Sequence, residues 1–176
     1  MMVFFSHGPG DPPPLLRPLP PGLTLRRWQA GKHGLPPRGS RSLVNFVWWL
    51  LNRLGFFATD EFTELTVWRG DNMVHRLLVT PRWHRLPFME PGDLEVGNIW
   101  TRPDARGQKL TPTIIGEAHR LFGDRQRRWW WLTDDDNAAS IASATRCNYR
   151  RIGTGYKTRP LGIGLWGQYR FEPIAE

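Results

Sequence analysis

The sequence has one cysteine and no long apolar run, and both absences narrow the class of protein. A single cysteine, Cys147, cannot form an internal disulfide, which suits a reducing compartment. The most apolar stretch, residues 43–51, is interrupted by Asn45 and is too short to cross a bilayer. The first ten residues turn to glycine and proline too soon for a signal peptide. We therefore expect a cytoplasmic protein without a membrane span.

Several catalytic patterns are also missing. No cluster of cysteine and histidine has the spacing of a zinc site, so we predict no metal. No Ser/His/Asp arrangement indicates a hydrolase, and no internal repeat is present. The length of 176 residues fits one domain with a substantial core.

Positive charge is in excess, because 24 Lys and Arg stand against 16 Asp and Glu, for a formal net charge of +8. Such a balance favours a polyanionic partner, which leaves open nucleic acid, an anionic membrane surface or a polyanionic cofactor. The basic residues are spread along the chain, with small clusters at 125–128 and 146–151 and no long basic arm. Charge alone does not choose among these partners.

The order of patterns predicts a mixed α/β domain. Residues 1–22 are rich in proline and are expected to form an extended tail or strap, with the folded domain at 23–176. Helical periodicity predicts helices at 42–54, 111–122 and 138–146, and Gly55 is placed to end the first. The β-prone runs are 23–28, 61–68, 73–80, 93–101, 129–132, 149–156 and 165–171, with a hairpin turn at 69–72.

The segment 93–123 is the most informative part of the chain. A β-prone run leads to Pro103 and a small basic loop at 106–109, and a helix follows. Thr111 is placed to be the N-cap of this helix and Pro112 its first helical residue. A strand, a loop and a helix N-terminus aimed at the loop bind anions, because unpaired N–H groups and the helix dipole point the same way.

This loop resembles the acyl-CoA pyrophosphate loop of the GNAT superfamily of N-acyltransferases. The family's pattern is Arg or Gln, two residues, Gly, one residue, then Gly or Ala. Arg106 and Gly107 fit it, whereas Lys109 and Thr111 stand where small residues are usual. The resemblance implies acetyl-CoA, or another acyl-CoA, as co-substrate, held by Arg106, Gly107, Gln108, Lys109, Leu110 and Thr111.

A second segment is similar to a later helix of the same family. Residues 137–141 match its start, and Asn148 stands where the family has the glycine that ends it. Asn is the residue next best able to adopt a left-handed C-cap. The resemblance implies a central, mostly antiparallel sheet of about six to seven strands flanked by helices, which splays apart after the strand ending at Thr101. It also implies that Ile99, Trp100, Thr101, Asn137 and Ser140 contact the pantetheine arm.

Acyl transfer to an amine needs a base that removes the ammonium proton. Glu95 is the first candidate, because several family members keep a catalytic Glu on this strand, and His75 is the runner-up. The position of the family's Tyr acid falls on Ala144, so the usual acid is absent. Cys147 is expected to be a buried hydrophobic residue and not a nucleophile.

The acceptor site is the least defined part of the prediction. Trp48, Trp83, His84 and Phe88 are candidates to line it, although the apolar helix that contains Trp48 favours a place in the core. The favoured function is an acyl-CoA-dependent N-acyltransferase that acts directly on a small amine, such as an amino sugar. An inactive GNAT-like module that binds nucleic acid or protein and an acetyltransferase acting on RNA remain open, as does a homodimer.

Overall fold

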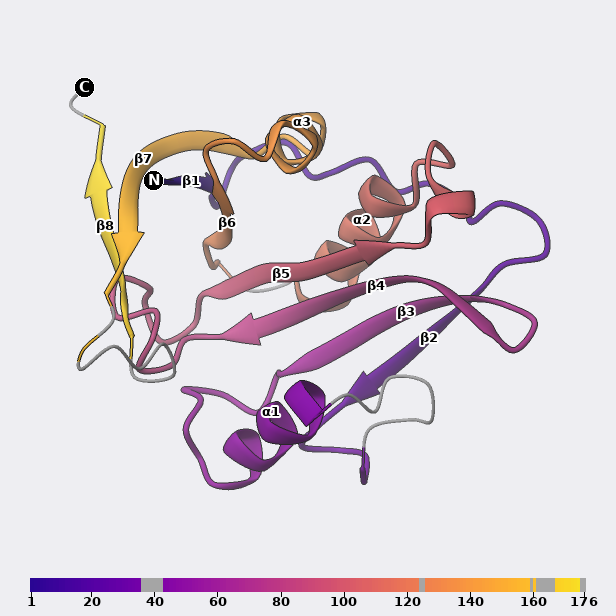
Figure 1. The fold of residues 1–176 in the computed structure, drawn as a ribbon, viewed down its shortest axis with the longest axis horizontal. Helices are drawn as coiled ribbons and strands as arrows, with labels where there is room; N and C mark the ends of the chain where they lie inside the picture. Colours follow the sequence, from indigo (N-terminus) through magenta and orange to yellow (C-terminus); the bar gives the residue numbers. More distant parts are fainter. Residues whose placement is uncertain (36–42, 124–125, 159, 161–166, 175–176) are drawn as a thin grey trace.

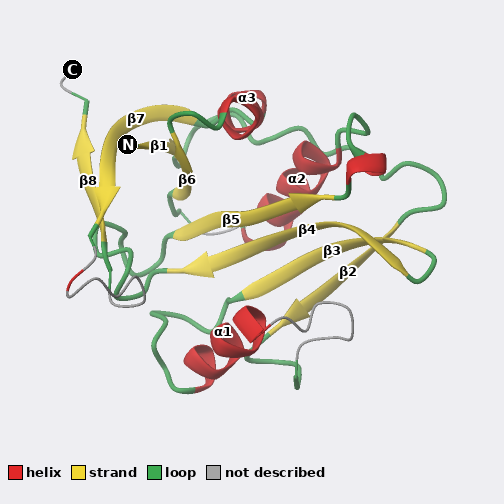
Figure 2. Ribbon diagram, viewed as in Figure 1, coloured by secondary structure: helices red, strands yellow, loops and turns green. Residues whose placement is uncertain are grey.

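The computed structural model describes residues 1–35, 43–123, 126–158, 160 and 167–174, with the side chains of 43–45 left out. In this part of the chain, eight strands form one mixed sheet in the order β2-β3-β4-β5-β6-β1-β7-β8 (Figures 1 and 2). The strands are β1 (Met2–His7), β2 (Thr24–Gln29), β3 (Thr63–Arg69), β4 (Asn72–Pro81), β5 (Leu94–Thr101), β6 (Trp129–Asp134), β7 (Arg150–Lys157) and β8 (Tyr169–Pro173). The helices are α1 (Leu43–Arg53), α2 (Leu110–Phe122), α3 (Ala138–Arg146) and a short 3₁₀ helix, η1 (Pro103–Ala105).

The predicted mixed α/β fold is confirmed, with one more strand than expected. Six of the predicted strands match observed ones to within a few residues, and the hairpin turns at Gly70 with φ 59°. The run predicted at 165–171 becomes β8, and its first two residues lie outside the described part of the chain. No helix in the described ranges is long and apolar enough to cross a membrane.

The prediction of a tail beginning at the first residue is wrong for residues 2–7. These residues form β1, which lies inside the sheet and pairs antiparallel with both β6 and β7. Phe4 and Val3 are 0% and 2% exposed, so the short apolar run is core. A strand with partners on both sides and both faces covered needs only a continuous apolar sequence, which the first residues supply.

The sheet opens at the pairing between β5 and β6. These two strands are parallel, whereas all other neighbouring pairs are antiparallel. They pair only at Leu94 with Trp129 and at Glu95 with Trp130, and they diverge from Gly97 onward. The predicted splay is therefore confirmed, and the second half of β5 has a free edge.

Helices cover both faces of the sheet. Below α2, Leu94 and Val96 of β5 join Ile114 in the larger hydrophobic core. The opposite face carries a smaller, aromatic core in which α1 packs with Trp48 and Trp49. Because side chains alternate along a strand, Glu95 and Gly97 lie on the α1 face, opposite Thr80 and Leu78 of β4.

The start of α2 differs from the prediction. The N-cap is Lys109 and not Thr111, and the helix begins at Leu110. Gly107 and Lys109 are both left-handed, with φ 79° and 57°, and so turn the chain sharply enough to bury Leu110, which is 2% exposed. Pro112 still falls in the first turn, where its missing N–H breaks no hydrogen bond.

Two predicted helix ends are confirmed. Gly55 follows α1 with φ 73°, and Asn148 follows α3 with φ 64°. A residue that replaces the glycine at this helix end has to adopt the left-handed conformation, and Asn does so more readily than other non-glycine residues. It turns the chain into β7 and buries Tyr149, which is 3% exposed.

Candidate functional site

A cleft of about 1270 Å³ opens where β5 and β6 diverge. Its walls are residues 97–101 of β5, 131–133 of β6, the loop and first turn of α2, and one side of α3. Residues 14, 15 and 17 of the proline-rich segment also line it. The divergence of the two strands is thus the origin of the cleft, because the covering helices do not fill the space between them.

The charge of the cleft is positive. Arg17, Arg106, Lys109 and Arg146 line it, and no Asp or Glu occurs among the described residues that do so. These four cations come from three separate segments of the chain, since Arg106 and Lys109 share one loop. Their convergence on one cavity favours a ligand with several negative charges.

The N-terminus of α2 adds backbone donors to this charge. The first N–H groups of a helix have no intrahelical acceptor, so those of Leu110 and Thr111 are available to a ligand. Lys109 is exposed and Thr111 is half-buried, and both line the cleft. Gln108, predicted to bind the cofactor, is not among the lining residues.

The β5 wall is irregular at the point where the cleft begins. Asn98 is left-handed, with φ 49°, and its Oδ1 accepts a hydrogen bond of 3.0 Å from Arg76 Nη2. The register with β4 shifts here, as expected of a β-bulge. The following residues, Ile99, Trp100 and Thr101, which are predicted to contact the pantetheine arm, line the cleft, and Trp100 is 38% exposed and so is not core.

The α3 wall contains the predicted Asn137 and Ser140, and both line the cleft. Asn137 caps the helix, since its Oδ1 accepts from the Ser140 N–H at 3.1 Å. Ser140 Oγ in turn accepts from Trp131 Nε1 at 3.0 Å. Just after the end of this helix, burial raises the pKa of Cys147 to about 12, so the thiol is protonated and inert.

Glu95 does not line the cleft itself, but its side chain lies beside Gly97, which does. A Cβ placed on Gly97, which lines the cleft, would lie 2.2 Å from Glu95 Oε1. Burial raises the pKa of Glu95 from its ordinary 4.5 to about 7, against the opposing effects of a hydrogen bond with Thr80 and of the Arg85 charge. A carboxylate with this pKa can both accept and release a proton near neutral pH.

His75 does not approach Glu95. It is 0% exposed and lies on the α2 side of β4, with Nδ1 2.8 Å from Thr101 Oγ1. Burial lowers the pKa of His75 to about 4, so the ring is neutral at pH 7. Its role here is packing and the support of Thr101 at the end of β5.

The structure separates the residues predicted for the acceptor site into two groups. Trp48 and Trp83 meet edge to face at 4.7 Å, and His84 packs on Trp83 at 4.6 Å, within the aromatic core under α1. Phe88 instead contacts Trp130 at 4.8 Å, beside the strand position that pairs with Glu95. Of these four residues, Phe88 is therefore the one that these contacts connect to Glu95, through Trp130.

Sequence reasoning missed two groups of residues around the cleft. One group, Leu15 and Arg17, lies in the proline-rich segment. No sequence motif marks these two residues, and only the path of the segment across the sheet brings them to the cleft. The other, Arg85 and Tyr169, is not part of the cleft wall but lies near Glu95: the Arg85 charge lowers the pKa of Glu95, and the Glu95 charge raises the pKa of Tyr169. Arg85 lies 5.4 Å from the Tyr169 ring centroid, and burial raises the pKa of Tyr169.

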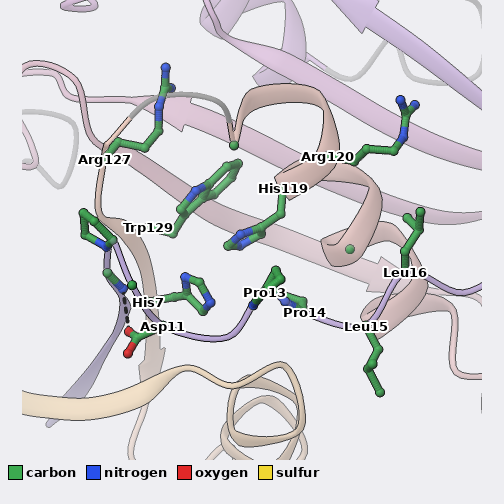
Figure 3. A pocket seen from close by; sticks show the side chains of 15 residues that line it. His7, Asp11, Pro13, Pro14, Leu15, Leu16, His119, Arg120, Arg127 and Trp129 are labelled. Atoms are coloured by element: carbon green, nitrogen blue, oxygen red, sulfur yellow. Dashed lines mark hydrogen bonds between the residues drawn. The ribbon is translucent and has the colours of Figure 1, made fainter.

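A smaller cavity of about 540 Å³ lies on the other side of the proline-rich segment (Figure 3). His119 forms its floor, stacked on Trp129 at 4.1 Å and hydrogen-bonded through Nε2 to the Tyr149 hydroxyl at 2.9 Å. Burial, aided by the charge of His7, lowers the pKa of His119 to about 3. The ring is therefore neutral and structural at pH 7.

No known protein family pattern matches the chain, and no curated protein does. Solved structures are similar, among them a tandem GNAT protein from the clavulanic acid biosynthesis pathway (TM-score 0.60, 12% identity, 85% of this chain and 50% of that chain). A Drosophila protein (TM-score 0.55, 14% identity, 85% and 47%) and a GCN5-related N-acetyltransferase from Sphaerobacter thermophilus (TM-score 0.51, 15% identity, 85% and 48%) are also similar. The chain spans about half the length of these proteins.

The protein therefore has the GNAT fold. At these identities the likeness establishes the fold alone, and the activity has to be inferred from the cleft. Among the described residues, no group of three or more His, Cys, Asp or Glu side chains could hold a metal ion.

Proposed function

We propose that the protein is an acyl-CoA-dependent N-acyltransferase that uses acetyl-CoA and transfers the acyl group directly to a small amine. One observation carries the proposal. The cleft between β5 and β6 is lined by basic side chains and a helix N-terminus, and the carboxylate of Glu95, with a pKa of about 7, lies beside Gly97 of its wall. The basic cleft suits a polyanionic acyl donor, and the carboxylate beside it suits a base for the acceptor.

The residues present fit acyl-CoA. Arg106, Lys109 and the N–H groups of Leu110 and Thr111 are suited to the pyrophosphate. The free edge of β5 offers main-chain groups to the amides of the pantetheine arm. When bound, acyl-CoA supplies a thioester whose carbonyl carbon accepts the amine nitrogen.

Glu95 is the group that handles the proton. In the reaction a C–N bond forms and a C–S bond breaks, and Glu95 takes the proton that the ammonium must lose. A main-chain N–H of the free β5 edge, near Ile99 or Trp100, stabilises the negative charge on the carbonyl oxygen. Because Ala144 is 0% exposed and has no acidic proton, the thiolate departs unassisted and is protonated by water.

The acceptor reaches Glu95 from the α1 face. Arg85 and Tyr169 border the carboxylate there, and the charges of Glu95 and Asp134 both act on the Tyr169 phenol. The two carboxylates favour a cationic amine over an anionic acceptor. We therefore place a small primary amine, such as an amino sugar, ahead of RNA.

Two measurements test the proposal. Titration calorimetry with acetyl-CoA should show one binding site, and a panel of primary amines that includes amino sugars should release thiol from acetyl-CoA. For the wild type, kcat/KM should rise with pH and level off above about pH 7. Glu95→Gln should lower kcat by about 10²- to 10⁴-fold and leave the affinity for acetyl-CoA unchanged.

Glu172→Gln is the matched control, because Glu172 is an exposed carboxylate on β8, far along the sheet from the cleft. It should keep the wild-type rate. Failure to bind acetyl-CoA at millimolar concentration would contradict the proposal. Binding without thiol release from any amine would instead favour an inactive module.

A further inference from the structure

The connection between β1 and β2, residues 8–22, is referred to here as the strap. It has to cross most of the sheet, because β1 lies between β6 and β7 whereas β2 is the far edge strand. Figure 1 shows it running past α3 and α2 before it turns to β2. Its path therefore takes it across the helices that frame the cleft.

The first half of the strap is fixed by several contacts. The Asp11 carboxylate accepts from the Gly8 N–H at 2.7 Å and forms an ion pair with Arg150 of β7. The Pro12 carbonyl accepts from His7 Nε2 at 3.0 Å and from Asn148 Nδ2 at 3.3 Å. These contacts tie the strap to β7 and to the end of α3.

The middle of the strap presses on α2. A Cβ placed on Gly116 would meet the Leu15 carbonyl oxygen at 2.8 Å, so this helix position has to be glycine for the strap to lie where it does. Glycine within a helix is unfavourable compared with alanine. Gly116 therefore makes the helix less stable than alanine would, but it leaves room for the strap backbone to approach closely.

The strap also presents side chains to the cleft. Leu15 and Arg17 line it, and in Figure 3 Leu15 points away from α2 whereas Leu16 points towards Arg120. Leu15 is 68% exposed, so its side chain is accessible to a ligand in the cleft. Among the described residues, Arg17 has no ion-pair partner, and the cleft it lines contains no acidic group.

We propose that the strap is a wall of the nucleotide end of the acyl-CoA site, in which Arg17 binds a phosphate group and Leu15 covers the apolar face of the bound nucleotide. This inference rests on the proposed function and adds a substrate-binding segment to it. Because the contacts with β7, α3 and α2 fix the strap backbone, Arg17 is held near its ligand before binding. This lowers the conformational entropy lost on association.

The test compares CoA with 3′-dephospho-CoA by titration calorimetry at low salt. Arg17→Ala should weaken CoA binding by about tenfold, as expected for loss of one charge-assisted contact. Arg170→Ala, which removes an exposed arginine on β8, should stay within about twofold of the wild type. A loss confined to CoA assigns Arg17 to the 3′-phosphate, and an equal loss for both ligands assigns it to the pyrophosphate; either supports the inference.

Gly116→Ala tests the strap independently of charge. Alanine favours the helix, so the protein should remain folded, but its methyl group has to displace the strap backbone. CoA affinity should fall severalfold. If Arg17→Ala and Gly116→Ala both bind CoA as tightly as the wild type does, the inference is overturned and the proposed function stands. If the wild type binds neither CoA nor acetyl-CoA, the proposed function itself fails.

Discussion

Glu95 should make the protein less stable as pH rises, and the effect can be measured without knowing the acceptor. The folded-state pKa of about 7 lies above the ordinary 4.5 of an unfolded chain. Between these two values the unfolded state releases a proton that the folded state keeps, so this group's contribution to stability is lost as pH rises from 4.5 through 7. Above pH 7 the full penalty of burying the carboxylate remains.

The size of the effect follows from the two pKa values. Each unit of pKa difference corresponds to about 1.4 kcal/mol, so the wild type should lose about 2.5 kcal/mol between pH 5 and pH 8.5 through this group alone. Glu95→Gln removes the titration and keeps the shape of the side chain. Urea unfolding of both proteins across this range isolates the effect, because every other group titrates alike in the two.

Parallel profiles of unfolding free energy against pH for the wild type and Glu95→Gln would contradict this prediction. If the wild type and Glu95→Gln change by the same free energy of unfolding from pH 5 to pH 8.5, the pKa of Glu95 is not raised in the folded state. The proposed base would then have an ordinary pKa. A difference of the opposite sign would mean that Glu95 is held ionised by a cation, and Arg85 would be the first candidate.

Two further predictions concern stability. Phe4→Ala should cost about 3–5 kcal/mol, because Phe4 is 0% exposed, whereas Leu16→Ala at a position 59% exposed should stay within about 0.5 kcal/mol; equal urea midpoints for the two would show that β1 is not in the core. Glu61→Gln should cost about 3 kcal/mol, because it leaves Arg127, 5% exposed and bonded to Glu61 at 3.0 and 3.1 Å, without its counter-charge. The double variant with Arg127→Met should recover part of that loss, and a loss below about 1 kcal/mol for Glu61→Gln would contradict the burial of the pair.

The second half of the chain could be predicted well because its signals are local. The strand, loop and helix around Gly107, and the helix between Asn137 and Asn148, depend on turn and cap residues only a few positions apart. The N-cap of α2 was misplaced by two residues, since Thr111 is the better capping residue by type. The helix instead begins at Leu110, because Leu110 is buried and Lys109 adopts a left-handed conformation. Local sequence preference reveals neither of these features.

The site could be predicted only where it is built from that local unit. Ile99, Trp100 and Arg106 were found because they lie within a few residues of the loop. Arg17 and Tyr169 were missed because strand order, and not sequence distance, brings them to the cleft and to Glu95. His75 was weighed as a base because a β-prone run does not reveal which face a side chain takes.

The position of β1 explains why the strap is rich in proline. Five strand spacings of about 4.8 Å separate β1 from β2, so the connection has to cover about 24 Å and also pass around α2. An extended polyproline chain advances about 3.1 Å per residue, so residues 8–22 have reach to spare. Length is therefore not what the prolines provide. They reduce the conformational freedom that the unfolded segment loses, which lets a segment without regular hydrogen bonds stay fixed against α2. A flexible connection of the same length could join the same strands, but it would not hold Arg17 at the mouth of the cleft.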